Sequence, residues 1–477
     1  MTTPQRSSSP PLAAREPFGR RILSELGLTA LARSTRDVKL LILQRFVRLA
    51  AYGASTLVLV SFLRALGHSR ARAGLFMTLT LIGDVLISLL LSLSADRLLG
   101  RRAVLALGAA LMVVSGFVFA AAPSSYWVLL AAAVVGVISP SGNEIGPFRA
   151  VEESIVAHLT PSADRSDVYA WYSLAGTAGT AFGIMACGWA VEGARSALGW
   201  SLFDAYRAVF LAYAALGLIK LMLALALSPT VEADEEGPSV SSSSGGAPTD
   251  TTPLLNSEPE SRPETRKTPW WAALLPQLSP ESKGITAALC LLFAVDSFAS
   301  GLAPLSWVTY YFRSHFDLDE GRLGSVFFTT SIISAASVIV ASALAKRLGN
   351  VKTMVFTHLP SAVFLALIPI PSSLPLSLLF LVLRACTQSM DVAPRSAFLA
   401  AVLLPSERTA VMGAINVVKT TAQSLGPLIT GILAGKELFW VSFVCAGSLK
   451  ASYDLGLLAV FKNYKRDRQE RRDEEQQ

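Results

Sequence analysis

The chain has 477 residues, of which 52% are hydrophobic and only 16% are charged, and its mean hydropathy is +0.49. This composition excludes a soluble enzyme of this size and indicates an integral membrane protein. The net charge of +7 does not require a nucleic-acid partner, because many lysines and arginines lie in the N-terminal arm, the loops and the C-terminal tail, as the positive-inside rule expects.

Residues 1–37 are expected to form a polar N-terminal arm on the cytoplasmic side of the membrane. The stretch Phe18–Leu31 has an amphipathic pattern that suits a helix lying on the membrane surface. The arm lacks an apolar core followed by a cleavage site, so we do not interpret it as a signal peptide.

Twelve apolar segments of bilayer-crossing length follow the arm, in two groups of six. The sequence therefore predicts an all-α integral membrane fold with two pseudo-symmetric six-helix halves, residues 38–228 and 284–461. An even number of spans places both termini on one side, and basic short loops place that side in the cytoplasm, although the first outer loop is also basic. The expected spans are 39–63, 72–95, 102–122, 126–157, 168–190, 205–228, 284–312, 321–345, 352–371, 374–402, 408–434 and 438–461.

Residues 229–283 are acidic and then rich in Ser, Gly and Pro, so they predict a disordered cytoplasmic linker between the halves. Within this linker, Asp250, Leu254 and Leu255 resemble an acidic dileucine signal read by sorting adaptors, or they are an incidental leucine pair. We expect the plasma membrane or a vacuolar or endosomal membrane. Residues 462–477 form a charged cytoplasmic tail.

The two halves repeat one another in the spacing of their glycines and charged residues. An ionisable residue precedes a glycine by five positions in the first and the seventh span, and the fifth and eleventh spans also share a spacing. Internal repeats of six spans are how large transporter families are built. The matching positions are Arg48 with Gly53, Asp296 with Gly301, Arg165 with Gly183, and Arg408 with Gly426.

The fourth and tenth spans each carry an acidic residue three positions before a proline. These pairs are Glu144 with Pro147 and Asp391 with Pro394. An ionised side chain at the bilayer centre costs about 2.5–3.5 kcal/mol on insertion scales. Apolar segments that are interrupted by Gly or Pro at matching positions of two halves indicate the binding site of a transporter.

The loop between the second and third spans reads S-L-S-A-D-R-L-L-G-R-R and resembles the G-x-x-x-D-R-x-G-R-R signature of the major facilitator superfamily. Ser92 replaces the first glycine, and the Leu98-Leu99 spacer is one residue longer than usual. A degenerate copy follows the eighth span at Ala345–Lys352. We expect a fungal-like member of unassigned subfamily, in which the loop acts as a cytoplasmic gate. The match is carried by Asp96, Arg97, Gly100, Arg101 and Arg102.

The resemblance implies that the first, fourth, seventh and tenth spans line a central cavity. We predict ion pairs between Arg48 and Glu144 and between Asp296 and Arg395, which either lock helices together or handle substrate and protons. Glu144 and Asp391 are the expected proton carriers. The expected pathway also includes Arg149, near Glu152 and Glu153, and Lys419 of the eleventh span.

These observations predict a secondary active transporter of a small organic solute, coupled to protons and working by alternating access, with export or compartment loading favoured. The alternatives are a transporter-like sensor and a uniporter. The sequence shows no nucleotide-binding motif, metal-ligand spacing or nucleophile with its base, so we expect no enzyme activity, cofactor or metal. The expected partners are the lipid bilayer, the solute, protons and a sorting adaptor, without nucleic acid, around a monomer.

Overall fold

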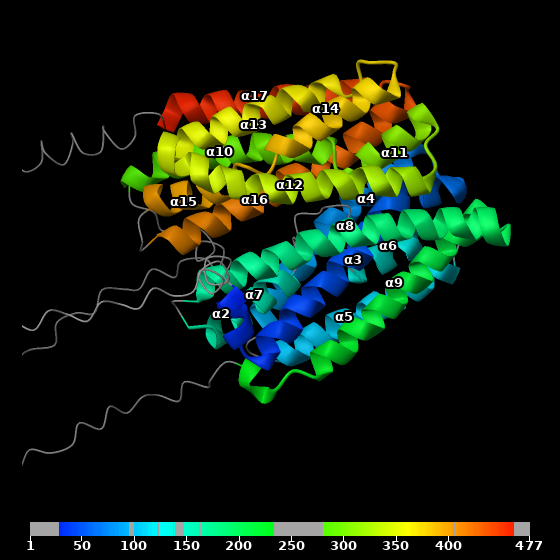
Figure 1. Cartoon of the computed structure of the whole chain (residues 1–477), viewed down its shortest axis with the longest axis horizontal. Helices are drawn as coiled ribbons and strands as arrows, with labels where there is room; N and C mark the ends of the chain where they lie inside the picture. The colour runs from blue at the N-terminus through cyan, green and yellow to red at the C-terminus, as the bar shows by residue number, and fades with distance from the viewer. Residues whose placement is uncertain are drawn as a thin grey trace, which may run out of the picture.

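The computed structural model describes residues 28–94, 100–121, 124–136, 138, 147–161, 164–232, 280–403 and 407–461. These residues form two helical bundles that lie side by side, α2 to α9 in one and α10 to α17 in the other (Figure 1). The bundles are close together near α4 and α11 and diverge toward the end that carries α2 and α15 (Figure 1). The predicted all-α fold with two six-helix halves is confirmed.

The helices follow the expected spans closely, and most are as long as a bilayer crossing requires. The first half consists of α2 (Leu28–Arg33), α3 (Arg36–Ala65), α4 (Arg70–Ser94), α5 (Arg101–Ala121), α6 (Tyr126–Val135), α7 (Pro147–Leu159), α8 (Arg165–Leu198) and α9 (Leu202–Leu225). The second half consists of α10 (Pro280–Leu302), α11 (Leu305–Phe316), α12 (Glu320–Leu348), α13 (Asn350–Leu367), α14 (Leu374–Thr387), α15 (Val392–Val402), α16 (Arg408–Gly435) and α17 (Phe439–Phe461).

Three spans that the sequence predicted as continuous helices each consist of two helices. The fourth span divides into α6 and α7, the seventh into α10 and α11, and the tenth into α14 and α15. A proline marks the start of each second piece: Pro147 is the first residue of α7, Pro304 caps α11, and Pro394 lies in the first turn of α15. Proline costs no hydrogen bond in a first turn, so a new helix can begin there, whereas Pro360 and Pro427 lie inside α13 and α16 without dividing them.

The same pairs of helices pack together in both halves. In the first half α3 packs on α8 and α5 on α9, and in the second half α10 packs on α16 and α13 on α17. A Cβ atom on Gly53 would overlap the Thr180 carbonyl oxygen, and one on Gly301 would overlap the Gln423 carbonyl oxygen. Small residues let membrane helices approach to backbone contact, so the repeated glycines record a repeated helix crossing.

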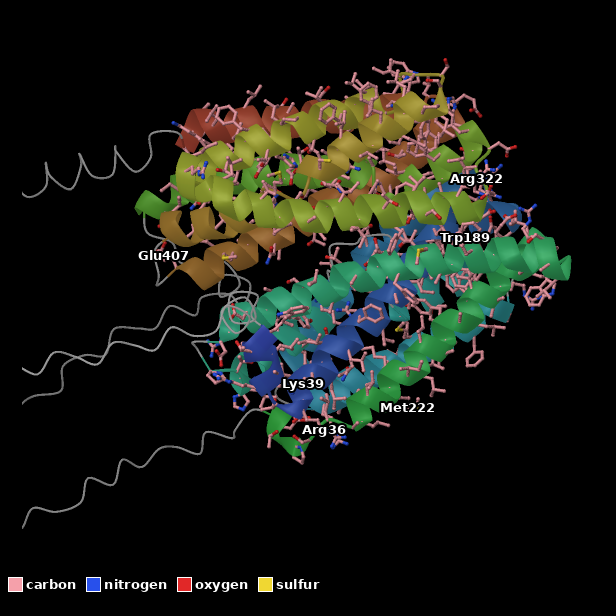
Figure 2. All side chains as sticks on the ribbon, in the orientation of Figure 1. Arg36, Lys39, Trp189, Met222, Arg322 and Glu407 are labelled. Carbon is pink, nitrogen blue, oxygen red and sulfur yellow. The ribbon has the colours of Figure 1, made fainter. Side chains whose placement is uncertain are left out.

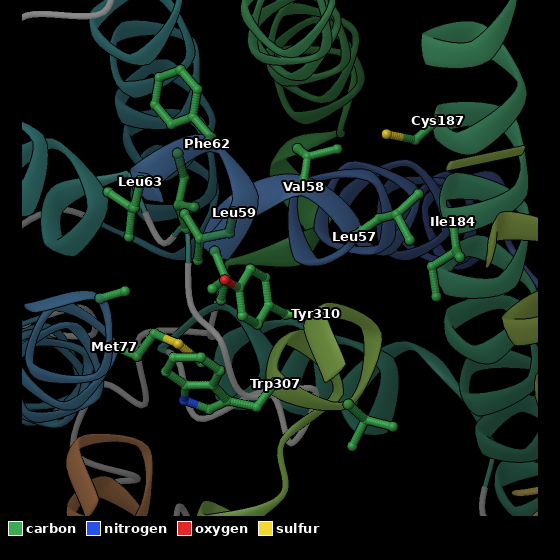
Figure 3. Close-up of a cluster of buried hydrophobic side chains, with 14 of the residues drawn as sticks. Leu57, Val58, Leu59, Phe62, Leu63, Met77, Ile184, Cys187, Trp307 and Tyr310 are labelled. Atoms are coloured by element: carbon green, nitrogen blue, oxygen red, sulfur yellow. The ribbon is translucent and has the colours of Figure 1, made fainter. Parts of the chain in front are cut away.

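The two halves meet along α8 with α12 and along α4 with α16. A buried apolar cluster crosses this boundary, and Figure 3 shows Met77 of α4 beside Trp307 of α11. Trp307 also donates from Nε1 to the carbonyl oxygen of Pro427 at 3.2 Å. On the face of α8, Trp189 donates to Ser325 Oγ of α12 at 3.0 Å (Figure 2).

The outer faces of the bundles are apolar, as a lipid environment requires. Met222 on α9 is 55% exposed and points away from the bundle (Figure 2). Judged by length and composition alone, six helices of the described chain are able to cross a membrane. The six are 36–65, 101–121, 167–198, 202–225, 282–316 and 439–461.

Candidate functional site

A cavity of about 490 Å³ lies between the two halves. Its apolar walls include Leu49, Val308 and Phe327. Its polar lining comes from both halves and consists mainly of hydroxyl groups with two arginines. The polar residues are Arg45, Tyr52, Ser173, Thr177 and Thr180 from the first half and Thr330, Ser331, Ser334, Arg384 and Gln388 from the second. Among the described residues that line the cavity, none is an aspartate or a glutamate.

Glu152 on α7 is the centre of a buried charge cluster in the first half. Its carboxylate is fully buried and accepts from Arg48 Nη2 at 3.2 Å and from Lys220 Nζ at 3.2 Å. The Tyr172 hydroxyl donates to the same carboxylate at 2.5 Å. The cluster therefore joins α3, α7, α8 and α9 through one carboxylate, two cations and a tyrosine hydroxyl.

Tyr172 connects this charge cluster to the cavity. The guanidinium of Arg45 lies over its ring, with Cζ 4.0 Å from the ring centroid. A cation on an aromatic face is attracted by the ring quadrupole, and the attraction increases when water is excluded. The stacked Arg45 is 5% exposed and forms part of the cavity wall.

The second half holds its charges in pairs. Lys450 Nζ of α17 donates to Asp296 Oδ1 of α10 at 2.7 Å and to Ser300 Oγ at 2.8 Å. Arg395 and Asp391 form an ion pair one helical turn apart on α15. These carboxylates are almost completely buried, which makes a paired cation necessary.

A further buried pair lies one turn beyond Lys450 on α17. Asp454 contacts His358 of α13, with 3.0 Å between Oδ1 and Nδ1. Both side chains are buried. The pair joins the same two helices that pack throughout this half, so it fixes α13 against α17.

Two polar clusters connect the halves at the end of the molecule opposite α2. In the first, Glu320 of α12 accepts from the Tyr206 hydroxyl at 2.7 Å and from Arg313 Nε at 2.6 Å. Arg195 of α8 lies 3.8 Å from the same carboxylate. Because Tyr206 and Arg195 belong to the first half and Glu320 to the second, this cluster holds the halves together.

The second inter-half cluster is built around Arg70 at the start of α4. Its Nη1 donates to the Ala434 carbonyl oxygen at 2.8 Å and pairs with Glu437, and its Nε donates to the Tyr310 hydroxyl at 3.4 Å. Glu437 is 81% exposed, so this cluster lies at the protein surface. We call the end of the molecule that carries the Glu320 and Arg70 clusters the closed end.

The family of the chain follows from comparison with known proteins. A family model described as "Major Facilitator Superfamily" matches residues 41–319 and 285–476. The chain belongs to the Major Facilitator Superfamily. An uncharacterized membrane protein of Saccharomyces cerevisiae, YJR124C, is 38% identical over 435 residues, which cover 90% of this chain and 94% of the relative. The fungal-like character predicted from the sequence agrees with this relative.

Solved structures of superfamily members share the fold. The nucleoside transporter NupG superposes with a TM-score of 0.63 at 14% identity and covers 90% of this chain and 100% of its own. A bacterial homologue of the iron transporter ferroportin, in an inward-facing state, gives a TM-score of 0.64 at 14% identity over 89% of this chain and 98% of its own. These structures show the same fold, and membership of the superfamily makes the chain a multi-pass membrane transporter.

The superfamily signature loop is described only in its second part. Gly100 has a left-handed backbone (φ +78°), and Glu232 accepts from the backbone nitrogens of Arg101 and Arg102 at 2.6 and 3.0 Å. A carboxylate at a helix N-terminus satisfies donors that the helix leaves unpaired. Glu232 thus caps α5 and ties this loop to the end of the sixth span. Asp96 and Arg97 lie outside the described residues.

Most of the predicted pathway residues lie in the Glu152 cluster of the first half or in the ion pairs of the second half, not on the cavity wall. None of the predicted residues that are described with their side chains, namely Arg48, Asp296, Asp391, Arg395 and Lys419, is part of the cavity lining. Lys419 Nζ lies 5.6 Å from the centroid of the Phe293 ring.

One predicted pair is wrong, and another is left untested. Asp296 binds Lys450 and Arg395 binds Asp391, so the expected Asp296–Arg395 pair is not formed. Lys450 reaches Asp296 because α17 packs directly against α10. The Arg48–Glu144 pair is not tested, because Glu144 lies outside the described residues, as do Asp250, Leu254, Leu255 and the side chain of Arg149.

Sequence reasoning did not identify the two lysines that neutralise Glu152 and Asp296. Lys220 and Lys450 occupy the sixth and twelfth spans, and each follows a glycine by three positions, at Gly217 and Gly447. This repeated G-x-x-K spacing was a readable signal. Reasoning from sequence also missed Arg384, a single charge in the apolar α14 helix. In the described ranges, no cluster of three or more His, Cys, Asp or Glu residues is placed to hold a metal ion.

Proposed function

We propose that this protein is a secondary active transporter that moves a small organic solute through the cavity between its halves by alternating access. The observation that carries this proposal is a cavity lined by both halves in a molecule whose halves are joined by polar clusters at one end only, among the residues described. Rocking the halves would open the closed end and close the other around the same site.

With both termini in the cytoplasm, the arrangement corresponds to an inward-facing state. The orientation follows from the basic residues of the short loops. The signature residues Asp96, Arg97, Gly100, Arg101 and Arg102 would then lie at the cytoplasmic end, where they would form the opposite gate. Export or loading of a compartment is the favoured direction. Asp250, Leu254 and Leu255 would direct the transporter to a vacuolar or endosomal membrane, with the plasma membrane as its default location.

We further propose that protons drive the movement, with Asp391 and Glu144 as carriers. Asp391 is 1% exposed, and its near neighbours Gln388 and Val392 line the cavity. Its partner Arg395 lies one turn further along α15. A rotation of the Arg395 side chain away from Asp391 would leave a buried carboxylate without its cation, and such a group takes up a proton.

The other predicted pathway residues would support this exchange from within each half. Arg48 holds Glu152, Asp296 holds Lys450, and Lys419 and Arg395 both face the ring of Phe293. Together with Arg149, these charges would set the electrostatic potential beside the cavity.

The test is solute accumulation in sealed membrane vesicles that contain the parent protein, Asp391→Asn or Asp317→Asn. The vesicles are incubated with a mixture of polar metabolites, with and without an imposed pH gradient, and their contents are measured by mass spectrometry. The exposed Asp317 has a left-handed backbone (φ 51°) that asparagine also adopts, so Asp317→Asn is the matched control.

We expect the parent and the control to concentrate at least one solute when the pH gradient is present, and Asp391→Asn to lose this dependence. Equilibration without any effect of pH would show a uniporter and refute the proton coupling. If the vesicle contents match those of vesicles without the protein, the transport proposal fails, and a solute-sensing role becomes the better interpretation.

A further inference from the structure

We propose that the cavity binds a small organic anion, held between Arg45 of the first half and Arg384 of the second. The ligand's negative group would be a carboxylate or a phosphate ester. This inference rests on the proposed function, because it takes the cavity as the solute site, and it adds the chemical class of the solute.

Arg384 differs from the cations of the charge clusters and pairs described above. It lies in α14, one turn before Gln388, and its side chain forms part of the cavity wall. The cations of the charge clusters and pairs, Arg48, Lys220, Arg395 and Lys450, each contact a carboxylate. Within the described chain, the guanidinium of Arg384 has neither an ion pair nor a hydrogen bond.

A charge in this position is costly unless something neutralises it. An ionised group inside a membrane protein pairs with another group or faces a water-filled path, and it marks the route of a substrate. Arg384 faces a cavity rather than lipid, so the counter-charge can be supplied by a ligand that enters the cavity. An arginine also remains charged throughout the physiological pH range, which excludes neutralisation by loss of its proton.

Arg45 presents a second guanidinium from the opposite half. The ring of Tyr172 supports one of its faces, and the hydrogen bond from Tyr172 to Glu152 holds that ring in place. Gly176 leaves the room for this packing, because a Cβ atom there would lie 2.7 Å from Arg45 Nε. The guanidinium is therefore fixed before a ligand arrives, and a fixed planar fork matches the oxygens of a carboxylate or phosphate.

The rest of the cavity suits the carbon skeleton of such a ligand. Leu49, Val308 and Leu381 supply apolar surface, and hydroxyl groups lie between them. Several of these hydroxyls donate within their own helix, as Ser331 Oγ does to the Phe327 carbonyl oxygen at 2.7 Å, so the strongest donors on the wall are guanidinium groups. A volume of about 490 Å³ lies within the usual range for small-molecule sites.

Because the two arginines belong to different halves, one anion in contact with both would draw the halves together. The described lining contains no carboxylate that would repel it. A cationic solute, by contrast, would meet the like charge of Arg384, and a neutral solute would leave Arg384 without a counter-charge. The charge pattern thus selects by the sign of the solute.

The test measures ligand binding to the purified full-length protein in detergent. The probes are succinate, citrate, glycerol 3-phosphate and glucose 6-phosphate as anions, succinamide, glucose and uridine as neutral compounds, and putrescine and choline as cations. We expect at least one anion to bind and to raise the unfolding temperature, while neutral and cationic probes do not. The carboxylates and the phosphate esters form separate arms, so the result identifies the anionic group.

Substitution of Arg384 then tests the site itself. For the anion that binds, Arg384→Gln should raise the Kd on the order of 100-fold, because a desolvated charge loses its partner. Arg384→Lys keeps the charge but loses the fork, and should raise the Kd by roughly tenfold. Binding of neutral or cationic probes only, no binding of any anion, or an unchanged Kd in Arg384→Gln would each overturn the proposal.

Stability without a ligand provides a second, independent measurement. Arg384→Gln removes an unpaired charge and should leave the unfolding temperature equal to or above that of the parent. Arg395→Gln removes a cation that pairs with buried Asp391 and should lower it. If both variants are destabilised equally, Arg384 has a counter-charge within the protein, and the proposal falls.

Failure of this inference can be distinguished from failure of the transport proposal. An anion that binds through Arg384 but does not accumulate in vesicles would support the anion site and refute transport. A neutral or cationic solute that accumulates in vesicles would support transport and refute the anion site.

Discussion

Glu152→Gln should be the most destabilising conservative substitution among the charges of the first half. The Glu152 carboxylate is 0% exposed and neutralises both Arg48 and Lys220 at 3.2 Å, and it also accepts the Tyr172 hydroxyl. Glutamine keeps the shape and one acceptor oxygen but removes the negative charge, so two cations remain buried without this counter-charge. Breaking a buried ion pair in this way costs about 3–5 kcal/mol.

The assay uses Cys187, which is buried in α8, as a reporter of unfolding in this half. The other three cysteines, Cys290, Cys386 and Cys445, are replaced by alanine, and a thiol-reactive dye follows the exposure of Cys187 as the purified protein is heated. A loss of about 3–5 kcal/mol corresponds to a fall in unfolding temperature of roughly 6–20 °C for a unit of this size.

Two further variants control this measurement. Glu192→Gln changes the same residue type on α8, where the side chain is 30% exposed and lies 4.0 Å from Arg195, and it should cost less than about 1 kcal/mol. Adding Lys220→Met to Glu152→Gln removes one of the two cations that Glu152 neutralises and should recover part of the loss. An unfolding temperature for Glu152→Gln within the range of Glu192→Gln would refute the role assigned to the cluster.

Three other substitutions test the closed end, the helix crossings and the signature loop. Glu320→Gln should weaken the inter-half cluster and shift the population toward opening of the closed end by on the order of tenfold. The opening is measured as faster thiol labelling of a Ser61→Cys variant, because Ser61 is only 5% exposed. An unchanged labelling rate would show that this cluster does not hold the halves together. Gly183→Ala should lower the free energy of unfolding by about 1–3 kcal/mol, because the added Cβ overlaps the Ala50 backbone. Gly193→Ala on the same helix has open space around it and should be neutral or stabilising, so equal unfolding temperatures would contradict the packing described. Glu232→Ala should cost about 0.5–2 kcal/mol by removing the cap of α5, and a stability equal to the parent would show that water replaces the carboxylate.

The fold was predictable because close helix crossings require glycine, and the spacing of glycines can be read from the sequence. Gly53 and Gly301 are where helices cross at backbone contact, and no other residue fits there, so their spacing is visible in the sequence. The breaks at Pro304 and Pro394 were also visible as prolines, but an apolar run gives no sign of whether proline bends a helix or begins a new one.

The pairing of charges was much less predictable. Glu144 and Glu152 are eight residues apart, which is close to two helical turns, so both could face Arg48 in a continuous helix. The choice between them depends on where α7 begins and how deep it lies. Arg384 was harder still, because an arginine in an apolar helix reads equally as a side chain that reaches the membrane surface. The unpaired state of its guanidinium among the described residues is a property of its neighbours in space.

The charge pairs that stabilise each half have a consequence for how the protein changes state. In the alternating access that we propose, each of the pairs Glu152–Lys220 and Asp296–Lys450 would move with its own bundle, so a switch between states would leave these bonds intact. The contacts that would have to break and re-form are those of Glu320 and Arg70. Under this proposal, stability and turnover rate could be changed separately: substitutions inside a bundle would alter the stability of the protein, and substitutions in the contacts between the halves would alter the rate of the cycle.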